Sequence, residues 1–251
     1  MIIDDVAAEA SAMNTEGKVL LVAGAGEGLG RSVAMRFARE GYAVALSARR
    51  VDGLNELARE IGGKPFPADL TSESEVIGLF DSVESGLGPI AAVAFVAATR
   101  VQGPFAELSV GDFERIWRQS CLSGFLVGRE ATRRMVPRGH GTVIFTGASS
   151  STRGRAGFAA FAAAKGGLRF MAQSMARELG PKGIHVATVL IEGAIDSPRM
   201  WQDDRERMEK LGPDGALHPD AIAETYWQIH CQPRSAWTHE ADLRPWAEPF
   251  A

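Results

Sequence analysis

Cysteine and tyrosine are both scarce in this chain of 251 residues, which contains two of each. Cys121 and Cys231 are too few for the disulfide framework of a small secreted protein, and they lack the paired Cys and His spacings of a metal site. We therefore expect a reduced, cytoplasmic protein that holds no metal ion.

The chain also lacks a strong excess of either charge and any long apolar run. Its formal net charge is −4, which gives no indication of a nucleic-acid partner. No apolar run approaches the roughly 18 residues of a membrane span. The first residues carry Asp4, Asp5 and Glu9 without an early basic residue, unlike a secretory signal. We expect no nucleic-acid or membrane partner, and we interpret residues 1–15 as a short N-terminal extension.

What the chain does contain is 45% hydrophobic residues, set in short apolar runs that alternate with longer amphipathic stretches. This alternation is typical of a parallel sheet covered by helices on both faces. It predicts an α/β fold, a Rossmann-type doubly wound sheet of about seven strands in a three-layer sandwich. The expected strands lie at residues 18–23, 42–46, 64–68, 90–97, 142–145 and 184–191 and within 235–246, and the main expected helices end at residue 39 or cover 51–61, 73–87, 112–135 and 158–179.

Residues 16–251 are expected to form a single domain, because no linker or charge block divides them. Residues 197–215 are polar and interrupted by Pro and Gly, which favours a mobile lid over a pocket. Trp237 and Trp246 follow the last expected helix, and aromatic residues at a chain end are more typical of subunit packing than of catalysis.

A glycine-rich turn gives the strongest local signal for a ligand. Gly24, Gly28 and Gly30 follow an apolar strand and open a helix, with Leu29 at the helix start. Such glycines allow a tight turn and bring backbone N–H groups close to a pyrophosphate. The turn therefore predicts a dinucleotide site, although a tight connection without a ligand remains the alternative.

The end of the second strand bears on which dinucleotide binds. An acidic residue is expected there when the ribose 2′-hydroxyl is free, but this chain has Arg49 and Arg50. Arginines can pair with a 2′-phosphate, so we predict NADP(H) in preference to NAD(H). Solvated surface arginines are the alternative, and Glu27 in the glycine turn is an unfavourable charge beside a phosphate.

Taken together, these motifs resemble the short-chain dehydrogenase/reductase family over nearly the whole chain. The glycine spacing is similar to the cofactor turn of that family, Asp69 and Leu70 to its adenine-contacting pair, and residues 192–197 to its Pro-Gly-x-Ile-x-Thr segment. The resemblance implies nicotinamide contacts from Ile195 and Ser197, a cofactor position at Ala97, and a homodimer or homotetramer.

The catalytic positions depart from the family pattern. Residues 161–165 stand where the family has Tyr-x3-Lys, and this places Phe161 at the position of the proton-donating tyrosine. Ala148 stands at the serine position and Ser120 at the asparagine position. Lys165 keeps the family identity, and the resemblance gives it a second role in binding the nicotinamide ribose. The cofactor half of the site is thus expected to be intact and the proton-transfer half to be dismantled.

Substitutes for the missing acid are few. Ser149 lies one residue out of register and is a weak candidate, because a serine hydroxyl is a poor acid without a base. Arg100, Arg153 and Arg155 flank the expected pocket mouth, where they could hold an anionic substrate or simply be solvated. Phe158, Phe161 and residues 194–201 would wall the pocket and favour an apolar small-molecule substrate.

Two functions remain open on this evidence. The first is an NADP(H)-dependent oxidoreductase that transfers hydride to or from a small carbonyl, alcohol or imine without the usual serine–tyrosine pair. The second is an inactive NADP(H)-binding protein that acts as a sensor or as the partner subunit of an active relative.

Overall fold

A seven-stranded parallel sheet forms the centre of the molecule, as expected. The structure is a computed structural model that describes residues 18–248, so the expected extension at residues 1–15 lies outside the described residues. The strand order is β3-β2-β1-β4-β5-β6-β7, and every neighbouring pair is parallel. The strands are β1 (Val19–Ala23), β2 (Ala43–Ser47), β3 (Lys64–Pro65), β4 (Ile90–Phe95), β5 (Gly141–Thr146), β6 (Ile184–Ile191) and β7 (Glu240–Leu243).

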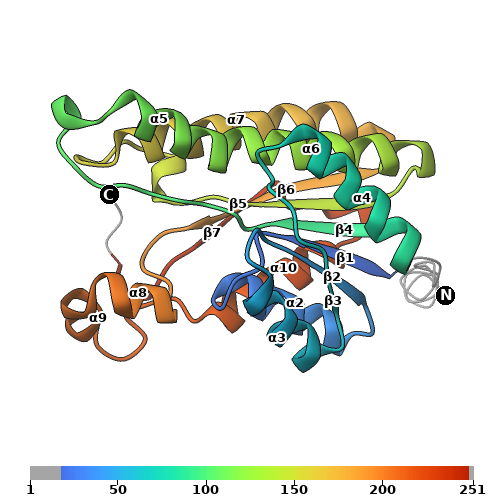
Figure 1. Ribbon diagram of the computed structural model, residues 1–251, viewed down its shortest axis with the longest axis horizontal. Helices are drawn as coiled ribbons and strands as arrows, with labels where there is room; N and C mark the ends of the chain where they lie inside the picture. Colours follow the sequence, from blue (N-terminus) through green and yellow to red (C-terminus); the bar gives the residue numbers. More distant parts are fainter. Residues whose placement is uncertain (1–17, 249–251) are drawn as a thin grey trace.

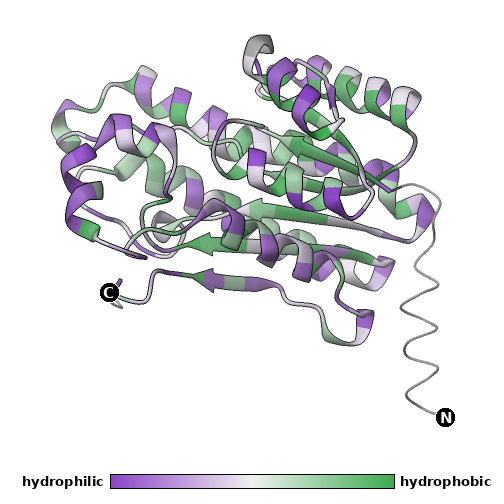
Figure 2. Ribbon diagram, turned by 90° about the horizontal axis from the view of Figure 1, so that it is seen from below, coloured by the Kyte–Doolittle hydropathy of each residue, from purple (hydrophilic) through white to green (hydrophobic). Residues whose placement is uncertain are grey.

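Helices cover both faces of this sheet (Figure 1). One face carries α4 (Glu73–Leu87), α5 (Val110–Trp117), α6 (Ser123–Met135) and α7 (Ala159–Leu179), and the other carries α2 (Leu29–Arg39), α3 (Val51–Ile61) and α10 (Pro219–His230). Each layer has its own apolar core. In Figure 2 the central strands are coloured as hydrophobic, and the helices alternate hydrophobic and hydrophilic residues. The three-layer prediction is confirmed.

The third strand is shorter than its expected range of residues 64–68. Only Lys64 and Pro65 are in regular register with β2, but the N–H groups of Phe66 and Ala68 still donate to the chain at and just beyond the end of β2 (2.8 and 3.3 Å). Prolines 65 and 67 alternate with these donors, so the N–H groups that they lack would face the open edge of the sheet, where proline is tolerated. The sequence thus predicted the extended conformation of this segment correctly but overestimated the length of the strand.

The expected helix over residues 112–135 is two helices joined by a π-helical turn at Arg118–Leu122. The first helix begins at Val110, because Ser109 caps it by accepting a hydrogen bond from the N–H of Asp112 (3.0 Å). Within the turn lies Ser120, and the Ser123 hydroxyl donates to the carbonyl of Gln119 (2.8 Å). Serine hydroxyls compete in this way with the regular helical ladder.

The segment at residues 197–215 contains two short helices rather than an irregular loop. They are α8 (Pro198–Asp203) and α9 (Arg205–Leu211), and both have side-chain caps. The Ser197 hydroxyl accepts from the N–H of Met200 and the Asp204 carboxylate from that of Arg207. Figure 1 shows both helices beyond the carboxyl ends of the strands, where a lid over a pocket would lie.

Candidate functional site

A cavity of about 850 Å³ lies where β4, β5 and β6 end. Segments that directly follow these three strands line it, and Leu29 at the start of α2 joins them. In an open α/β sheet, ligands bind outside the carboxyl ends of the strands where the strand order reverses, here between β1 and β4. The cavity is therefore where the fold itself favours a ligand.

The glycine turn packs against the residue expected to help hold the cofactor. Gly24 has a φ of +99°, and a Cβ placed on it would lie 2.5 Å from the backbone nitrogen of Ala97. A Cβ on Gly30 would lie 2.9 Å from the Cα of Ala25. Both glycines are thus required by the close approach of backbone to backbone.

Other positions of the same turn leave room for a ligand. A Cβ on Gly26 would meet nothing within 4 Å. Helix α2 begins at Leu29, and the N–H of Arg31 donates to the Gly26 carbonyl (2.9 Å), so the N–H groups of Leu29 and Gly30 are the first-turn donors that favour an anion. Gly28 also faces the 195–197 segment, because a Cβ on it would lie 3.2 Å from the Cβ of Ser197. The structure thus brings together two expected cofactor segments that are far apart in sequence, and their geometry fits a dinucleotide.

The residues expected at the adenosine end lie on the adjoining edge of the sheet, outside the cavity lining. Arg49 and Arg50 follow β2 and are exposed. Within residues 18–248 neither forms an ion pair, which leaves both guanidinium groups available to a phosphate. Asp69 accepts hydrogen bonds from the backbone N–H and hydroxyl of Thr71, and these lower the pKa of its carboxyl. Leu70 is buried in the core.

Lys165 lies on the floor of the cavity and is 2% exposed. Its ammonium Nζ donates to the carbonyl oxygen of Thr146 (2.7 Å). Because burial disfavours the charged form, the pKa of Lys165 falls to about 8. Sequence reasoning missed the role of Thr146, which is the last residue of β5 and continues the expected strand.

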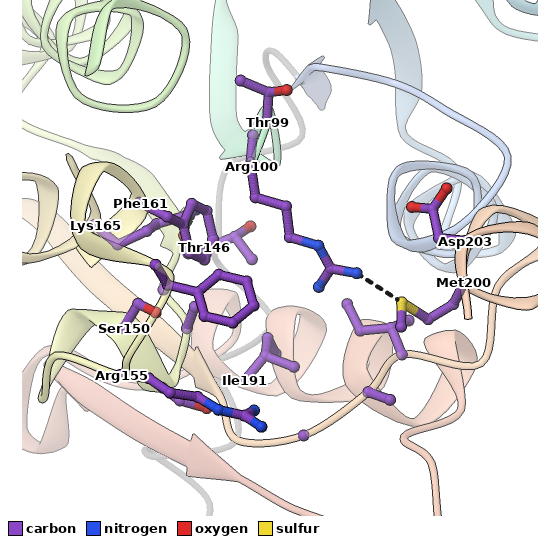
Figure 3. Close-up of a pocket in the computed structure, with 18 of the residues that line it drawn as sticks. Thr99, Arg100, Thr146, Ser150, Arg155, Phe161, Lys165, Ile191, Met200 and Asp203 are labelled. Atoms are coloured by element: carbon purple, nitrogen blue, oxygen red, sulfur yellow. Dashed lines mark hydrogen bonds between the residues drawn. The ribbon is translucent and has the colours of Figure 1, made fainter. Parts of the chain in front are cut away.

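Phe161 stands one helical turn before Lys165 on α7, as the spacing predicts, and its ring lines the same cavity (Figure 3). The Lys165 Nζ lies 5.8 Å from the centre of that ring. Ala148 lines the cavity from the β5 side. The two positions where the family resemblance implies hydroxyl groups are thus in the cavity, and both side chains there are inert.

Neighbouring serines differ in their availability. The Ser151 hydroxyl accepts from the N–H of Ala148 (3.0 Å), so it is used within the loop. Ser149 and Ser150 both line the cavity. Ser120 is fully buried in the π-helical turn, its hydroxyl has no hydrogen-bond partner, and it is not among the residues that line the cavity. Ser120 therefore does not line the cavity, and its role at the asparagine position stays a prediction.

Neither tyrosine can replace the missing acid. Tyr226 is fully buried behind β5 and its hydroxyl lies 2.6 Å from that of Thr146, and burial raises its pKa. Tyr42 contacts His230 at 2.5 Å, and burial raises its pKa to about 12. Neither lines the cavity.

The cavity wall is more cationic than the sequence predicts. Phe158, Ala194, Ile195, Ser197 and Met200 contribute as expected, but Trp201 does not; its indole N–H donates to Asp196 (2.7 Å), which is also outside the lining. The lining includes five arginines and two carboxylates: Arg100, Arg153, Arg155, Arg199, Arg207, Asp203 and Glu248. The expectation of an apolar pocket is thus only half correct, because Arg199 and Arg207 of the lid line the cavity together with the three arginines named from the sequence.

One of these arginines has a structural partner. Arg153 forms an ion pair with Glu192, which is 1% exposed, with N–O distances of 2.8 and 3.3 Å. Glu192 stands where the family segment has proline. The buried carboxylate therefore fixes Arg153 against the start of the 192–197 segment.

Among the described residues, no group of three or more His, Cys, Asp or Glu side chains could hold a metal ion. In the same part of the chain, no helix is long and apolar enough to cross a bilayer.

Comparison with known proteins gives consistent matches. The family model of short chain dehydrogenases matches residues 18–209. A short-chain dehydrogenase/reductase of Armillaria gallica is 33% identical over 198 residues, which cover 75% of each chain. The human 3-oxoacyl-[acyl-carrier-protein] reductase is 29% identical over 200 residues, covering 79% of this chain and 84% of the human protein.

Solved structures agree with these matches. A short-chain dehydrogenase from Rhodopseudomonas palustris has a TM-score of 0.77 and 38% identity, covering 91% of this chain and 98% of its own. A variant of actinorhodin polyketide ketoreductase with NADPH has a TM-score of 0.85 at 21% identity, covering 93% of this chain and 98% of its own, which is a likeness of fold.

Proposed function

The chain belongs to the short-chain dehydrogenase/reductase family of NAD(P)-dependent oxidoreductases, and from this premise we propose that it is an NADP(H)-dependent oxidoreductase with an atypical proton-transfer site. It transfers hydride to or from a small carbonyl, alcohol or imine without a serine–tyrosine pair. The observation that carries the proposal is Lys165, buried at the floor of a cavity that the glycine turn and residues 195–197 also border.

In this proposal the residues of the cofactor half keep their expected roles. The turn at Gly24, Gly28 and Gly30 and the start of α2 bind the pyrophosphate. Ile195 and Ser197 contact the nicotinamide amide, and both lie at the cavity wall. The nicotinamide of the bound cofactor supplies or accepts the hydride.

NADP(H) is favoured over NAD(H) by the end of β2. Arg49 and Arg50 are exposed there and form no ion pair within residues 18–248, although Arg49 is near enough to Asp69 to help lower the pKa of that carboxyl. A guanidinium can bind a 2′-phosphate through two parallel hydrogen bonds, which a free hydroxyl cannot match. The same arginines offer no such gain to NAD(H).

Lys165 takes over the proton chemistry in this proposal. When hydride reaches a carbonyl carbon, the oxygen gains negative charge and needs a donor. The ring of Phe161 has no proton to give. The Lys165 ammonium faces the same space, and its pKa of about 8 is close to the pH at which an acid catalyst works best.

The cofactor claim is tested by fluorescence titration of the protein with NADPH and NADH. Wild type is expected to bind NADPH more tightly, and Arg49→Ala to lose roughly tenfold in NADPH affinity, as for one charge-assisted contact, with little change for NADH. Arg59→Ala, on the exposed face of α3, is the matched control. Equal affinity for both dinucleotides in wild type would contradict the proposed preference.

A second candidate function is a cofactor-binding protein without catalysis, acting as a sensor or as the partner subunit of an active relative. The observation that favours it is the pair of inert side chains at positions 148 and 161. The two candidates are separated by single-turnover absorbance at the NADPH band over a panel of ketones, aldehydes and imines. Tight NADPH binding with no oxidation by any of them supports the second candidate.

A further inference from the structure

Arg100 occupies an unusual position among the cavity cations. It lies five residues beyond the end of β4, and Figure 3 shows its side chain extending into the cavity between Phe161 and Met200. Its one hydrogen bond runs from a guanidinium nitrogen to the Met200 sulfur (3.2 Å), which is a weak acceptor. A guanidinium has five N–H donors, so most of its capacity remains unused.

Of the other four arginines of the lining, two are paired with carboxylates: Arg153 with Glu192, and Arg199 with Asp203 (3.4 Å). Within residues 18–248, Arg155 and Arg207 form no ion pair, but Arg207 belongs to the lid helix α9. Arg155 lies 5.7 Å over the ring of Phe158. Among the described residues, Arg100 forms no ion pair, although Asp203 and Asp204 attract it across the cavity, and its side chain is still partly exposed; its partial burial lowers its pKa.

The charge of the cavity contrasts with that of the whole chain. The chain carries a formal net charge of −4, yet cationic side chains outnumber carboxylates in the lining. Partly buried cations close together repel one another and lower the stability of the fold, and binding of an anion offsets that repulsion. The arginine-rich lining therefore indicates an anionic ligand rather than a solvated surface.

We propose that Arg100 binds a carboxylate on the substrate, so that the protein acts on a small oxo acid or hydroxy acid. A carboxylate accepts two parallel hydrogen bonds from one guanidinium, which fixes both its position and its orientation. Arg100 is bonded to the lid through Met200, so an anion there would contact both the strand end and α8. The neighbouring Phe161 ring and Ile191 provide apolar wall for the remainder of the substrate.

This inference rests on the proposed function for its reaction but not for its test, which measures binding. The protein loaded with NADP⁺, which cannot reduce a ketone, is titrated calorimetrically with phenylglyoxylate and with its methyl ester, a pair that differs in the negative charge. We expect the acid to bind at least tenfold more tightly than the ester, as for a charge-assisted contact. The preference is expected to shrink as ionic strength rises.

Variants of Arg100 test whether this residue causes the preference for the acid over the ester. Arg100→Gln is expected to remove it and leave ester affinity within about twofold, while Arg100→Lys keeps part of it, because a lysine retains the charge but not the paired hydrogen bonds. Arg205→Gln is the matched control, since Arg205 lies on the lid helix α9 outside the lining and pairs with Glu209. NADPH affinity should be the same in all four proteins.

The outcomes separate the two proposals. If the acid and ester bind equally, if neither binds, or if Arg100→Gln keeps the preference, the carboxylate site is wrong. If the preference depends on Arg100 but no oxo acid oxidises NADPH in any amount, the carboxylate site stands and the proposed oxidoreductase function fails. If neutral ketones oxidise NADPH as well as their acid counterparts do, the oxidoreductase function stands and the carboxylate site is wrong.

Discussion

Phe161 and Ala148 are the two residues at which this chain departs most clearly from the chemistry of its family. Both line the cavity at the positions that the spacing from Lys165 predicts, so the positions themselves are in place and only the side chains differ. A tyrosine at 161 would lie near the Lys165 ammonium, which lowers a phenol pKa. The serine–tyrosine pair is therefore absent because two side chains differ, and not because the fold differs.

We predict that the double change Ala148→Ser, Phe161→Tyr raises the rate of carbonyl reduction. General acid catalysis contributes typically 10²–10⁴-fold, so the gain should be at least about a hundredfold over wild type. NADPH oxidation followed by absorbance measures it. The single change Ala148→Ser is the control, because it adds a hydroxyl but no acid. A double variant that folds, binds NADPH and shows no gain would show that the cavity is not a catalytic site of this kind.

Lys165 gives a second prediction at the residue scale, on stability. Its pKa falls from 10.5 to about 8 on folding, so between these values the unfolded chain binds more protons than the folded one. The contribution of Lys165 to the free energy of unfolding therefore rises with pH across that window. The size of the shift corresponds to about 3 kcal/mol.

The measurement is the free energy of unfolding in urea at pH 7.5 and pH 10 for wild type and Lys165→Met. The wild type should gain up to about 3 kcal/mol relative to the variant over this range. Lys182→Met removes an exposed lysine and should track the wild type. Parallel curves for wild type and Lys165→Met would mean that folding does not lower the pKa of Lys165 and that the lysine keeps its proton in the cavity across this range.

At the scale of elements, the connection from β1 to α2 combines structure and ligand binding in one turn. At position 24 the φ of +99° and the close contact with Ala97 both require glycine, whereas a Cβ at position 26 would meet nothing within 4 Å. We predict that Gly24→Ala lowers the free energy of unfolding by about 2–4 kcal/mol, because a side chain there is both strained and overpacked.

Gly26→Ala provides the matched control for that prediction, and thermal unfolding of the two variants is the measurement. It should leave the melting temperature near that of wild type while weakening NADPH, because the added methyl lies where the cofactor is expected to approach. If Gly24→Ala is as stable as Gly26→Ala, the close packing of the turn on Ala97 is not as described.

The elements also show how far sequence reasoning reaches. Six strand positions and the main helices follow from apolar periodicity, and Lys165, Phe161 and Ala148 were placed from motif spacing alone. The π-helical turn around Ser120 could not be predicted, because a one-residue change in the hydrogen-bond ladder leaves the apolar pattern almost unaltered.

Tertiary contacts account for the remaining differences. The ion pair of Arg153 with Glu192 joins residues 39 positions apart, and the Arg100 contact with Met200 joins residues 100 positions apart. No local pattern contains such pairs, so the sequence could name the arginines but not tell which of them is free to bind a ligand. The separation of a paired from an unpaired arginine comes from the fold.

For the whole molecule, exposed aromatic residues on one face bear on the assembly expected from the family resemblance. Phe113, Trp117, Phe125 and Phe170 lie on or beside α5, α6 and α7 and are 39–65% exposed. Trp246 lies just beyond β7, which is an edge strand of the sheet, and is 83% exposed. Large exposed apolar side chains gathered on packed helices favour burial against another subunit.

We therefore predict that the protein is a homodimer or homotetramer built on these two surfaces, as measured by sedimentation velocity. Phe170→Glu should disrupt the helical interface, because a charge buried there would have no partner, and Trp246→Glu should affect only the association through β7. In a tetramer each variant would stop at a dimer, whereas in a helix-face dimer only Phe170→Glu gives monomers. Arg59→Glu, at an exposed position of α3 in the opposite helical layer, controls for charge alone. A wild-type monomer at micromolar concentration would contradict the assembly and leave the aromatic residues of α5–α7 without this explanation.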